Sequence, residues 1–225
     1  MNYLYCILVI YLIPLIAFII YRLSFNKYDK EDNNKELSGF EVSRKILDNN
    51  NLEDIYIIEK RGIFTDIYDS KQDVIRLSTP TFHNETIYSL SLSSYIASKM
   101  VLFKKNNKAV KFKVLIDNFI SILTIFLYII FLIALLTESS STYQIVFYLL
   151  LFIIIYNILT IPIENIIIKH SYEELNKNKY LNKTNKESLE KCNNNLKLFS
   201  LMQTIIVLSN IYYYLKEEIK NNIRK

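Results

Sequence analysis

Glycine and histidine are scarce in this chain of 225 residues, which has two of each. Gly39 and Gly62 stand apart, so the chain lacks the glycine-rich loop that a dinucleotide-binding fold requires. His83 and His170 share no metal-ligand spacing with each other, so no local histidine motif for zinc is present. These absences argue against a nicotinamide-dependent oxidoreductase and against a metal centre of a familiar kind.

Charged side chains are absent from four long stretches. The first three stretches are strongly apolar and comprise residues 1–21, 118–137 and 139–163. The fourth, residues 198–215, is also uncharged but contains polar side chains. An apolar run of roughly 18 residues is long enough to cross a bilayer as a helix. The sequence therefore predicts an integral membrane protein in contact with the lipid bilayer.

The first run has features of a retained anchor. Pro14 lies in its middle, and no small-residue cleavage pattern precedes Arg22. Cys6 lies in this run and Cys192 in a distant polar stretch, so a disulfide would have to join the membrane to the water phase. We expect both cysteines to be free and the compartment to be reducing.

The positive charge follows the membrane runs. The net charge of +5 would be compatible with nucleic acid, but the lysines gather beside the apolar stretches. They include Lys99, Lys104, Lys105, Lys108, Lys111 and Lys113 before the second run, and Lys169, Lys177 and Lys179 after the third. The positive-inside rule explains this placement without a nucleic-acid partner. It predicts a multi-pass protein of the cell membrane with a cytoplasmic soluble part and an outward-facing turn at Glu138.

The soluble part is predicted to combine short helices with a small antiparallel sheet. A flexible tether (residues 26–36) precedes a helix at residues 40–48. Short β-branched and aromatic runs predict strands at residues 55–58, 63–68 and 74–77, the last two joined by a turn.

A helix is expected over residues 81–105. Asn84 is predicted to cap its first turn, and Glu85 lies where the helix dipole favours a negative charge. One buried stripe should follow helical spacing, with Ile87, Leu90, Ser94, Ala97 and Val101.

The second and third runs should form an antiparallel membrane hairpin. Its second helix is expected to continue past Pro162 with a kink, which places Glu164 near the membrane boundary. The fourth run is expected to be a helix packed against its neighbours, at the interface or only marginally spanning, because Gln203, Thr204, Ser209 and Asn210 lie inside it.

Several segments in order resemble the neutral zinc metallopeptidases of bacterial membranes, the YugP-like family. Residues 37–48, LSGFEVSRKILD, are similar to the family's L-T-G-x-E-V-A-R-x-I-L-D. Tyr68-Asp69 followed by residues 74–78, VIRLS, is similar to Y-D-P and x-V-R-L-S, and residues 161–164, IPIE, to x-L-P-V-E. The resemblance implies a small cytoplasmic α+β zincin-like domain attached to three to four membrane helices in a mainly α protein.

This resemblance divides the chain into four parts. They are an anchor (1–23), a cytoplasmic metallopeptidase-like domain (24–113), a membrane hairpin (114–164), and a polar helical segment with a C-terminal apolar helix (165–225).

The catalytic motif of the family is missing. Where the family has H-E-x-x-H, the chain has Tyr95, Ile96 and Lys99, and Ile67 replaces a further histidine. A phenol and an ammonium are poor zinc ligands at neutral pH, and isoleucine cannot move a proton. Glu164 matches the family's third zinc ligand, although a carboxylate reaching toward water from a helix end would give the same sequence pattern. The family uses zinc, but for this chain no cofactor is expected.

Other chemistries are weaker alternatives. Tyr95-x-x-x-Lys99 is also the spacing of the short-chain dehydrogenase pair, which would need the missing glycine-rich loop. A Ser-Lys dyad lacks a serine three or four residues from Lys99. A new metal site of His83, His170 and Glu164 would have to converge from distant segments.

Two functions follow from the sequence. The first is a pseudopeptidase without zinc that binds an active homologue or a membrane protein substrate, and the second is a peptidase with a rebuilt catalytic site. For the emptied site we predict an ion pair between Lys99 and Glu164, with Tyr95 donating a hydrogen bond to the carboxylate. The alternative is that Lys99 extends into water.

Overall fold

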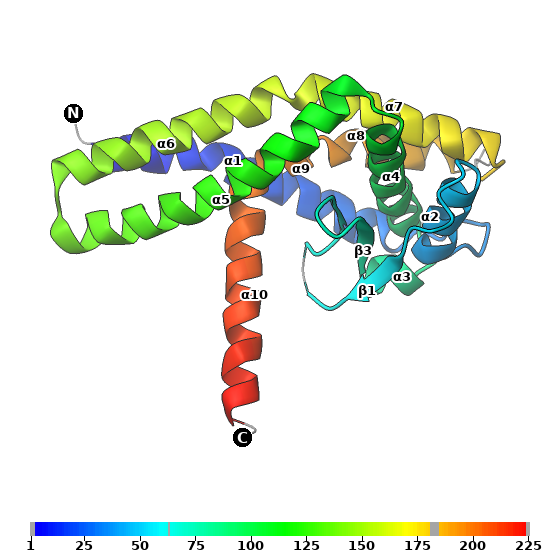
Figure 1. The fold of residues 1–225 in the computed structure, drawn as a ribbon, viewed down its shortest axis with the longest axis horizontal. Coiled ribbons are helices and arrows are strands. Elements are labelled where there is room, and N and C mark those ends of the chain that lie inside the picture. Colours follow the sequence, from blue (N-terminus) through cyan, green and yellow to red (C-terminus); the bar gives the residue numbers. More distant parts are fainter. Residues whose placement is uncertain (1–2, 63, 181–184, 224–225) are drawn as a thin grey trace.

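The computed structural model describes residues 3–62, 64–180 and 185–223, which form a helical protein with a small sheet at one end (Figure 1). Three long helices lie together: α1 (Tyr3–Tyr28), α5 (Lys108–Thr137) and α6 (Ser140–Leu159). The N-terminal end of α1 and the α5–α6 turn lie at the same end of this bundle, away from the sheet (Figure 1).

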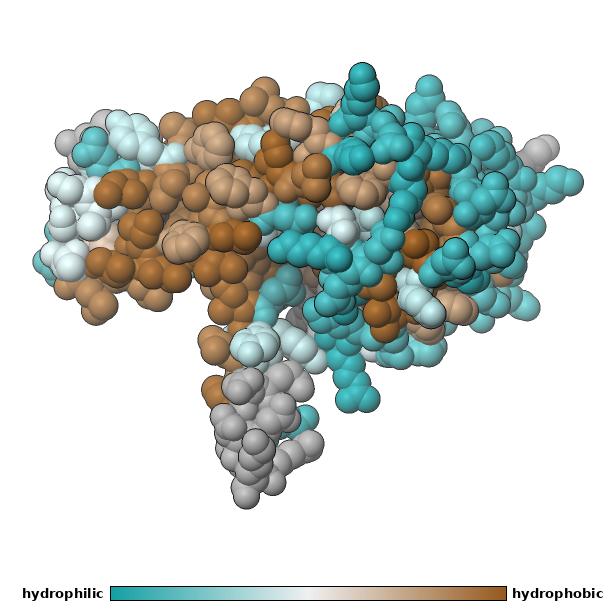
Figure 2. All heavy atoms as spheres, in the orientation of Figure 1, coloured by the Kyte–Doolittle hydropathy of each residue, from teal (hydrophilic) through white to brown (hydrophobic). Residues whose placement is uncertain are grey.

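The bundle has the surface of a membrane domain. Its helices pack through a narrow apolar seam that includes Ile7, Ile120, Leu127, Leu150 and Ile153. Most of their other apolar side chains are exposed, and Figure 2 shows a continuous hydrophobic surface over this end of the molecule. Three helices are long and apolar enough to cross a membrane in the described residues, or four if a bent pair is counted as one. The described residues therefore contain the three to four candidate membrane helices that the sequence predicted.

The third apolar run continues past Pro162 as expected. α6 ends at Leu159, and α7 (Ile161–Lys177) follows with only Thr160 between them. Pro162 lies in the first turn of α7, where a missing N–H costs no internal hydrogen bond. Residues 140–177 therefore form nearly one helix, which reaches from the bundle into the polar part of the protein.

The sheet is mixed, not antiparallel as the sequence suggested. Its strands β1 (Ile57–Lys60), β2 (Ile67–Asp69) and β3 (Val74–Ser78) lie in the order β1-β3-β2. β2 and β3 form the predicted antiparallel hairpin, whose turn is held by the Asp69 carboxylate accepting the backbone N–H groups of Lys71 (3.0 Å) and Gln72 (3.2 Å). β1 pairs parallel with β3, because the chain leaves β1 for the far edge of the sheet and returns through its centre.

The expected helix over residues 81–105 is divided in two, and Asn84 does not cap it. α3 (Thr79–His83) ends at Asn84, and α4 (Ile87–Lys104) begins after Thr86, whose side chain accepts the Ser89 N–H at 3.2 Å. The break arises because residues 31–33, expected to be a tether, pair with residues 85–87. The Asn33 N–H donates to the Glu85 carbonyl at 2.9 Å, and the Ile87 N–H to the Glu31 carbonyl at 2.8 Å.

α4 is buried on nearly every side, well beyond the single stripe that its sequence predicted. It packs against α2 (Gly39–Asp48), α5, α7 and α8 (Lys186–Leu196). Its serines make close contacts with two helices: Ser94 Oγ lies 2.8 Å from Ser171 Oγ of α7, and the Ser93 carbonyl accepts from Ser43 Oγ of α2 at 3.3 Å. Ser91 Oγ donates to Asn193 Oδ1 of α8, so small polar side chains let three helices approach α4 closely.

The fourth apolar run is bent. It forms α9 (Leu198–Leu201) and the first part of α10 (Gln203–Ile223), and the helical stretches on either side of Met202 meet at 76°. α9 packs against α1 and α6, as expected of a helix held by its neighbours, whereas α10 projects sideways from the bundle (Figure 1).

Gly39 gives a test of how closely α2 packs against α3 and α4. It follows Ser38, which caps α2 in a capping box with Glu41, and a Cβ at Gly39 would collide with the Thr81 carbonyl oxygen and lie 3.2 Å from Ser93 Cβ. We expect Gly39→Ala to destabilise the protein by about 1–3 kcal/mol through overpacking. Thermal unfolding in detergent measures this loss. Lys45→Ala, on the exposed face of α2, is the control, and equal melting temperatures for the two variants would contradict the prediction.

Candidate functional site

Glu164 is the centre of a buried polar cluster between the bundle and the sheet domain. It lies in the first turn of α7, where the helix dipole favours a carboxylate, and its side chain is 2% exposed. Three groups donate hydrogen bonds to it. Tyr95 Oη of α4 lies 2.5 Å from Oε2, Ser200 Oγ of α9 lies 2.8 Å from Oε1, and Lys113 Nζ of α5 lies 3.2 Å from Oε1.

Lys113 supplies the positive charge of this cluster. Its side chain is 2% exposed, and its ammonium also lies 2.9 Å from both carboxylate oxygens of Asp117, one turn further along α5. Tyr156 Oη of α6 donates to Asp117 Oδ1 at 2.9 Å and so closes the cluster on the bundle side. An ammonium held between two carboxylates has the counter-charges that a buried lysine needs.

The predicted ion pair between Lys99 and Glu164 is wrong. The Lys99 ammonium lies 3.5 Å from Asp117 Oδ2, and Lys113 occupies the place beside Glu164. The physical reason is that α5 inserts its own lysine between α4 and α7, which leaves Lys99 at the outer side of the cluster. Lys99 is 18% exposed, so it does not extend freely into water either.

The role of Lys113 was not predicted from the sequence, because Lys113 was counted among the lysines at the membrane boundary. The sequence nevertheless contains an indication that Lys113 forms an ion pair. Lys113 and Asp117 are four residues apart at the start of an apolar run, which is the spacing of an ion pair on one helix face. An acidic partner inside a group of lysines distinguishes Lys113 from its neighbours.

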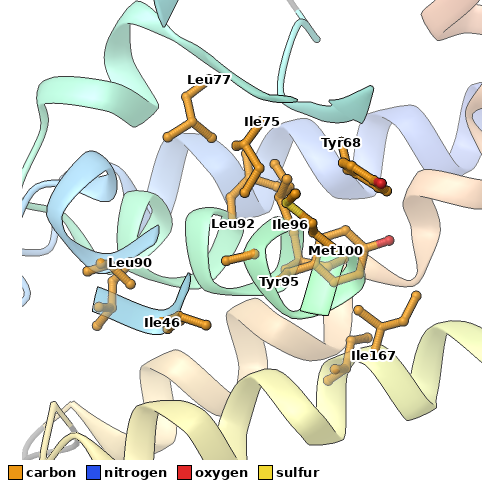
Figure 3. Close-up of a cluster of buried hydrophobic side chains, with 14 of the residues drawn as sticks. Ile46, Tyr68, Ile75, Leu77, Leu90, Leu92, Tyr95, Ile96, Met100 and Ile167 are labelled. Atoms are coloured by element: carbon orange, nitrogen blue, oxygen red, sulfur yellow. The ribbon is translucent and has the colours of Figure 1, made fainter. Parts of the chain in front are cut away.

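The predicted hydrogen bond from Tyr95 to Glu164 is confirmed. Burial raises the pKa of the Tyr95 phenol well above its ordinary value, and the nearby Glu164 carboxylate acts in the same direction. Tyr95 therefore stays protonated and donates its hydrogen throughout the physiological pH range. Ile96 is 2% exposed and belongs to the apolar core, and Figure 3 shows it beside Tyr95 and Met100.

A cleft of about 180 Å³ opens beside the cluster. Its lining includes Ile67 and Tyr68 of β2, Val114 and Asn118 of α5, and Gln203 and Ile206 of α10. Tyr95, Lys99 and Glu164 of the polar cluster also line it. The cleft therefore lies where the sheet domain meets the apolar bundle, and both ionic and apolar side chains line it.

The two histidines do not meet Glu164. His83 Nε2 lies 3.3 Å from Glu59 Oε2, and His170 Nε2 lies 4.0 Å from Glu174 Oε1. In the part of the chain that the structure describes, no three His, Cys, Asp or Glu side chains gather as a metal site would require. The structure thus does not assemble the metal site of His83, His170 and Glu164 that the sequence left open. Cys6 and Cys192 are both free, as expected.

Comparison with known proteins adds two findings. The profile of a family described as "Putative neutral zinc metallopeptidase" matches residues 3–217. Over 74 residues the chain is 36% identical to a Bacillus subtilis protein named "Putative membrane protease YugP", and this match covers 33% of either chain. No solved structure matches the chain.

The coupling of Lys113 to Glu164 can be measured in a double-mutant cycle. Lys113→Met should destabilise the protein by about 3–5 kcal/mol, because it leaves a buried carboxylate without its cation. The same change in a Glu164→Gln background should cost clearly less. Unfolding free energies of the four proteins in one detergent give the interaction energy.

Lys99→Met is the matched control, since Lys99 contacts Asp117 and not Glu164. Its cost should be the same with and without Glu164→Gln. Additive effects of Lys113→Met and Glu164→Gln, within about 0.5 kcal/mol, would show that the two groups are not coupled.

Proposed function

Because this chain belongs to the neutral zinc metallopeptidase family, we propose that it is a membrane-embedded pseudopeptidase that keeps the family scaffold, has lost catalytic zinc, and acts by binding a polypeptide partner. The observation that carries the proposal is the set of partners around Glu164, whose carboxylate is engaged by Lys113, Tyr95 and Ser200. These donors occupy three of the roughly four acceptor positions of the carboxylate, and one of them is a cation, so a metal ion would have to compete with them.

The donor set does not fit zinc. A catalytic zinc site uses about three protein ligands drawn from imidazole, thiolate and carboxylate groups. At the positions that resemble the family's histidines this chain has a protonated phenol and an ammonium, and Ile96 lies at the position of the general base. The Lys113 ammonium beside Glu164 would also repel a divalent cation.

A binding role is supported by the cleft. Its ionic side chains can recognise polar backbone or side-chain groups, and its apolar side chains can contact the hydrophobic side chains of a polypeptide. Because the cleft lies at the border of the apolar bundle, a segment next to a membrane helix could reach it. We therefore propose that the partner is an active homologue or a membrane protein substrate. Nothing in the cleft favours the peptidase with a rebuilt site.

The orientation in the membrane is part of the proposal. The soluble part, with α2, α4 and the sheet, is assigned to the cytoplasm, because lysines gather at the boundary on this side whereas the Glu138 turn at the other end has none nearby. The free cysteines agree with a reducing compartment.

Zinc content tests the pseudopeptidase proposal. The full-length protein, purified in detergent without chelators, should carry well under one zinc per chain by mass spectrometry, since at most one ligand, Glu164, remains. A chelator should leave its melting temperature unchanged. About one zinc per chain in the wild type that disappears in Glu164→Gln would overturn the proposal.

A variant designed to bind zinc serves as the positive control for the expected absence of zinc in the wild-type protein. Tyr95→His, Ile96→Glu and Lys99→His restore the family residues, and Lys113→Met removes the competing cation. The combined variant should bind zinc and melt at a higher temperature with zinc than without it. The same change in melting temperature for the wild-type protein would show that it already binds the metal.

Cysteine labelling tests the orientation. In a Cys6→Ser, Cys192→Ala background, a cysteine replacing Ser140 at the α5–α6 turn should react with a membrane-impermeant maleimide applied to intact cells. A cysteine replacing Lys45 on exposed α2 should react only after the cells are opened. The reverse pattern would place the sheet domain outside.

A further inference from the structure

The last helix, α10, runs crosswise to the three long apolar helices (Figure 1). Three hydrogen bonds join its base to α5. Gln203 Nε2 donates to the Asp117 carbonyl at 3.1 Å and to Ser121 Oγ at 3.2 Å, and Tyr128 Oη donates to the Thr204 carbonyl at 2.9 Å. In this direction α10 does not run parallel to the three long apolar helices.

The base of α10 lies at the boundary between the polar and apolar parts of the protein. Asp117 is the last charged residue of α5 before its uncharged run, residues 118–137. Figure 2 shows the hydrophobic surface of the bundle and the hydrophilic surface of the sheet domain meeting where α10 emerges. Gln203 contacts Asp117 at the start of this run and Thr204 contacts Tyr128 near its middle, so α10 leaves the bundle in the half of the apolar run nearer the sheet domain.

One face of α10 points toward the sheet domain. Ile206 lines the cleft, and Tyr213 lies against the Gly62 segment, where a Cβ at Gly62 would be 3.6 Å from the tyrosine ring. These residues are seven apart and so share one helix face. Successive residues turn by about 100°, which places residues 208, 212, 215 and 219 on the opposite face.

That opposite face is an exposed apolar stripe. Its side chains are Leu208 (44% exposed), Tyr212 (67%), Leu215 (53%) and Ile219 (59%). In Figure 2 the hydrophobic atoms of the upper part of α10 lie on the side toward the bundle, not toward the sheet domain. The stripe thus faces the region that lipid would occupy around the three long helices.

We propose that α10 is an interfacial helix that lies in the plane of the membrane on the side of the sheet domain, with this stripe inserted at the boundary between headgroups and acyl chains. Lipid is the proposed occupant because the stripe lies on the side of α10 toward the exposed apolar surface of the bundle (Figure 2). Tyrosine at position 212 also suits the interface, where its ring is buried and its hydroxyl stays hydrated.

Apolar area is the basis of the proposed attachment. The four side chains of the stripe carry no charge, so insertion should occur in vesicles of neutral phosphatidylcholine. It has two consequences: the C-terminal end stays on the side of the sheet domain, and one wall of the cleft is held at the membrane surface.

Tryptophan quenching tests the proposal, because the chain has no tryptophan of its own. Tyr212→Trp and Leu215→Trp place a fluorophore in the stripe. Asn210→Trp places one at an exposed position on the face of α10 that points away from the stripe. Phe126→Trp, in the middle of α5, is the control for depth. The full-length variants are reconstituted in phosphatidylcholine vesicles with bromine on the acyl chains, either near the headgroup or near the methyl end.

We expect quenching of the two stripe variants to exceed that of Asn210→Trp about threefold or more, and to be stronger with bromine near the headgroup. Phe126→Trp should respond most to bromine near the methyl end. Strongest quenching of the stripe variants by the deep bromine would show that α10 crosses the membrane. Quenching of the stripe variants no stronger than that of Asn210→Trp would show that water or a protein covers the stripe, and either result would overturn the proposal.

Discussion

The arrangement of the whole protein depends on one buried charge pair, between Glu164 of α7 and Lys113 of α5. A carboxylate that is 2% exposed is stable only with compensating partners, and these partners come from three other helices, α4, α5 and α9. The same ammonium contacts Asp117, which in turn receives a hydrogen bond from Tyr156 of α6. One ionic cluster therefore fixes the apolar bundle against the sheet domain, because each helix must keep its position for every charge to be paired.

Close packing around α4 is the second constraint. Its serines and the facing Gly39 allow α2, α7 and α8 to approach one helix from different sides. Larger side chains would separate these helices and move Tyr95 away from Glu164. Packing by small residues thus holds these helices together, and an internal ammonium provides a positive charge next to the buried carboxylate of Glu164.

The composition of the site was predictable from the sequence in part. Tyr95, Lys99 and Glu164 were correctly expected to lie in one region, since helical spacing and the resemblance to the family placed them together. The hydrogen bond from Tyr95 to Glu164 was predicted correctly, but the cation beside Glu164 was expected on α4 and lies on α5. Lys99 and Lys113 are both lysines near the membrane boundary, and only the packing of α5 between α4 and α7 decides which of them reaches Glu164.

The sequence by itself determined the features that depend on neighbouring residues: three long apolar helices, the start of α2 near Ser38, the β2–β3 turn at Asp69, and the continuation of the helix past Pro162. Each follows from local hydrophobicity, capping or backbone geometry. Tertiary structure decided the parallel pairing of β1 with β3, the break between α3 and α4, the bend at Met202 and the ion pairs of the buried cluster. These features depend on contacts between segments that are distant in the sequence. For each segment several partners would give contacts of similar energy, and only the packing of the surrounding helices selects one of them.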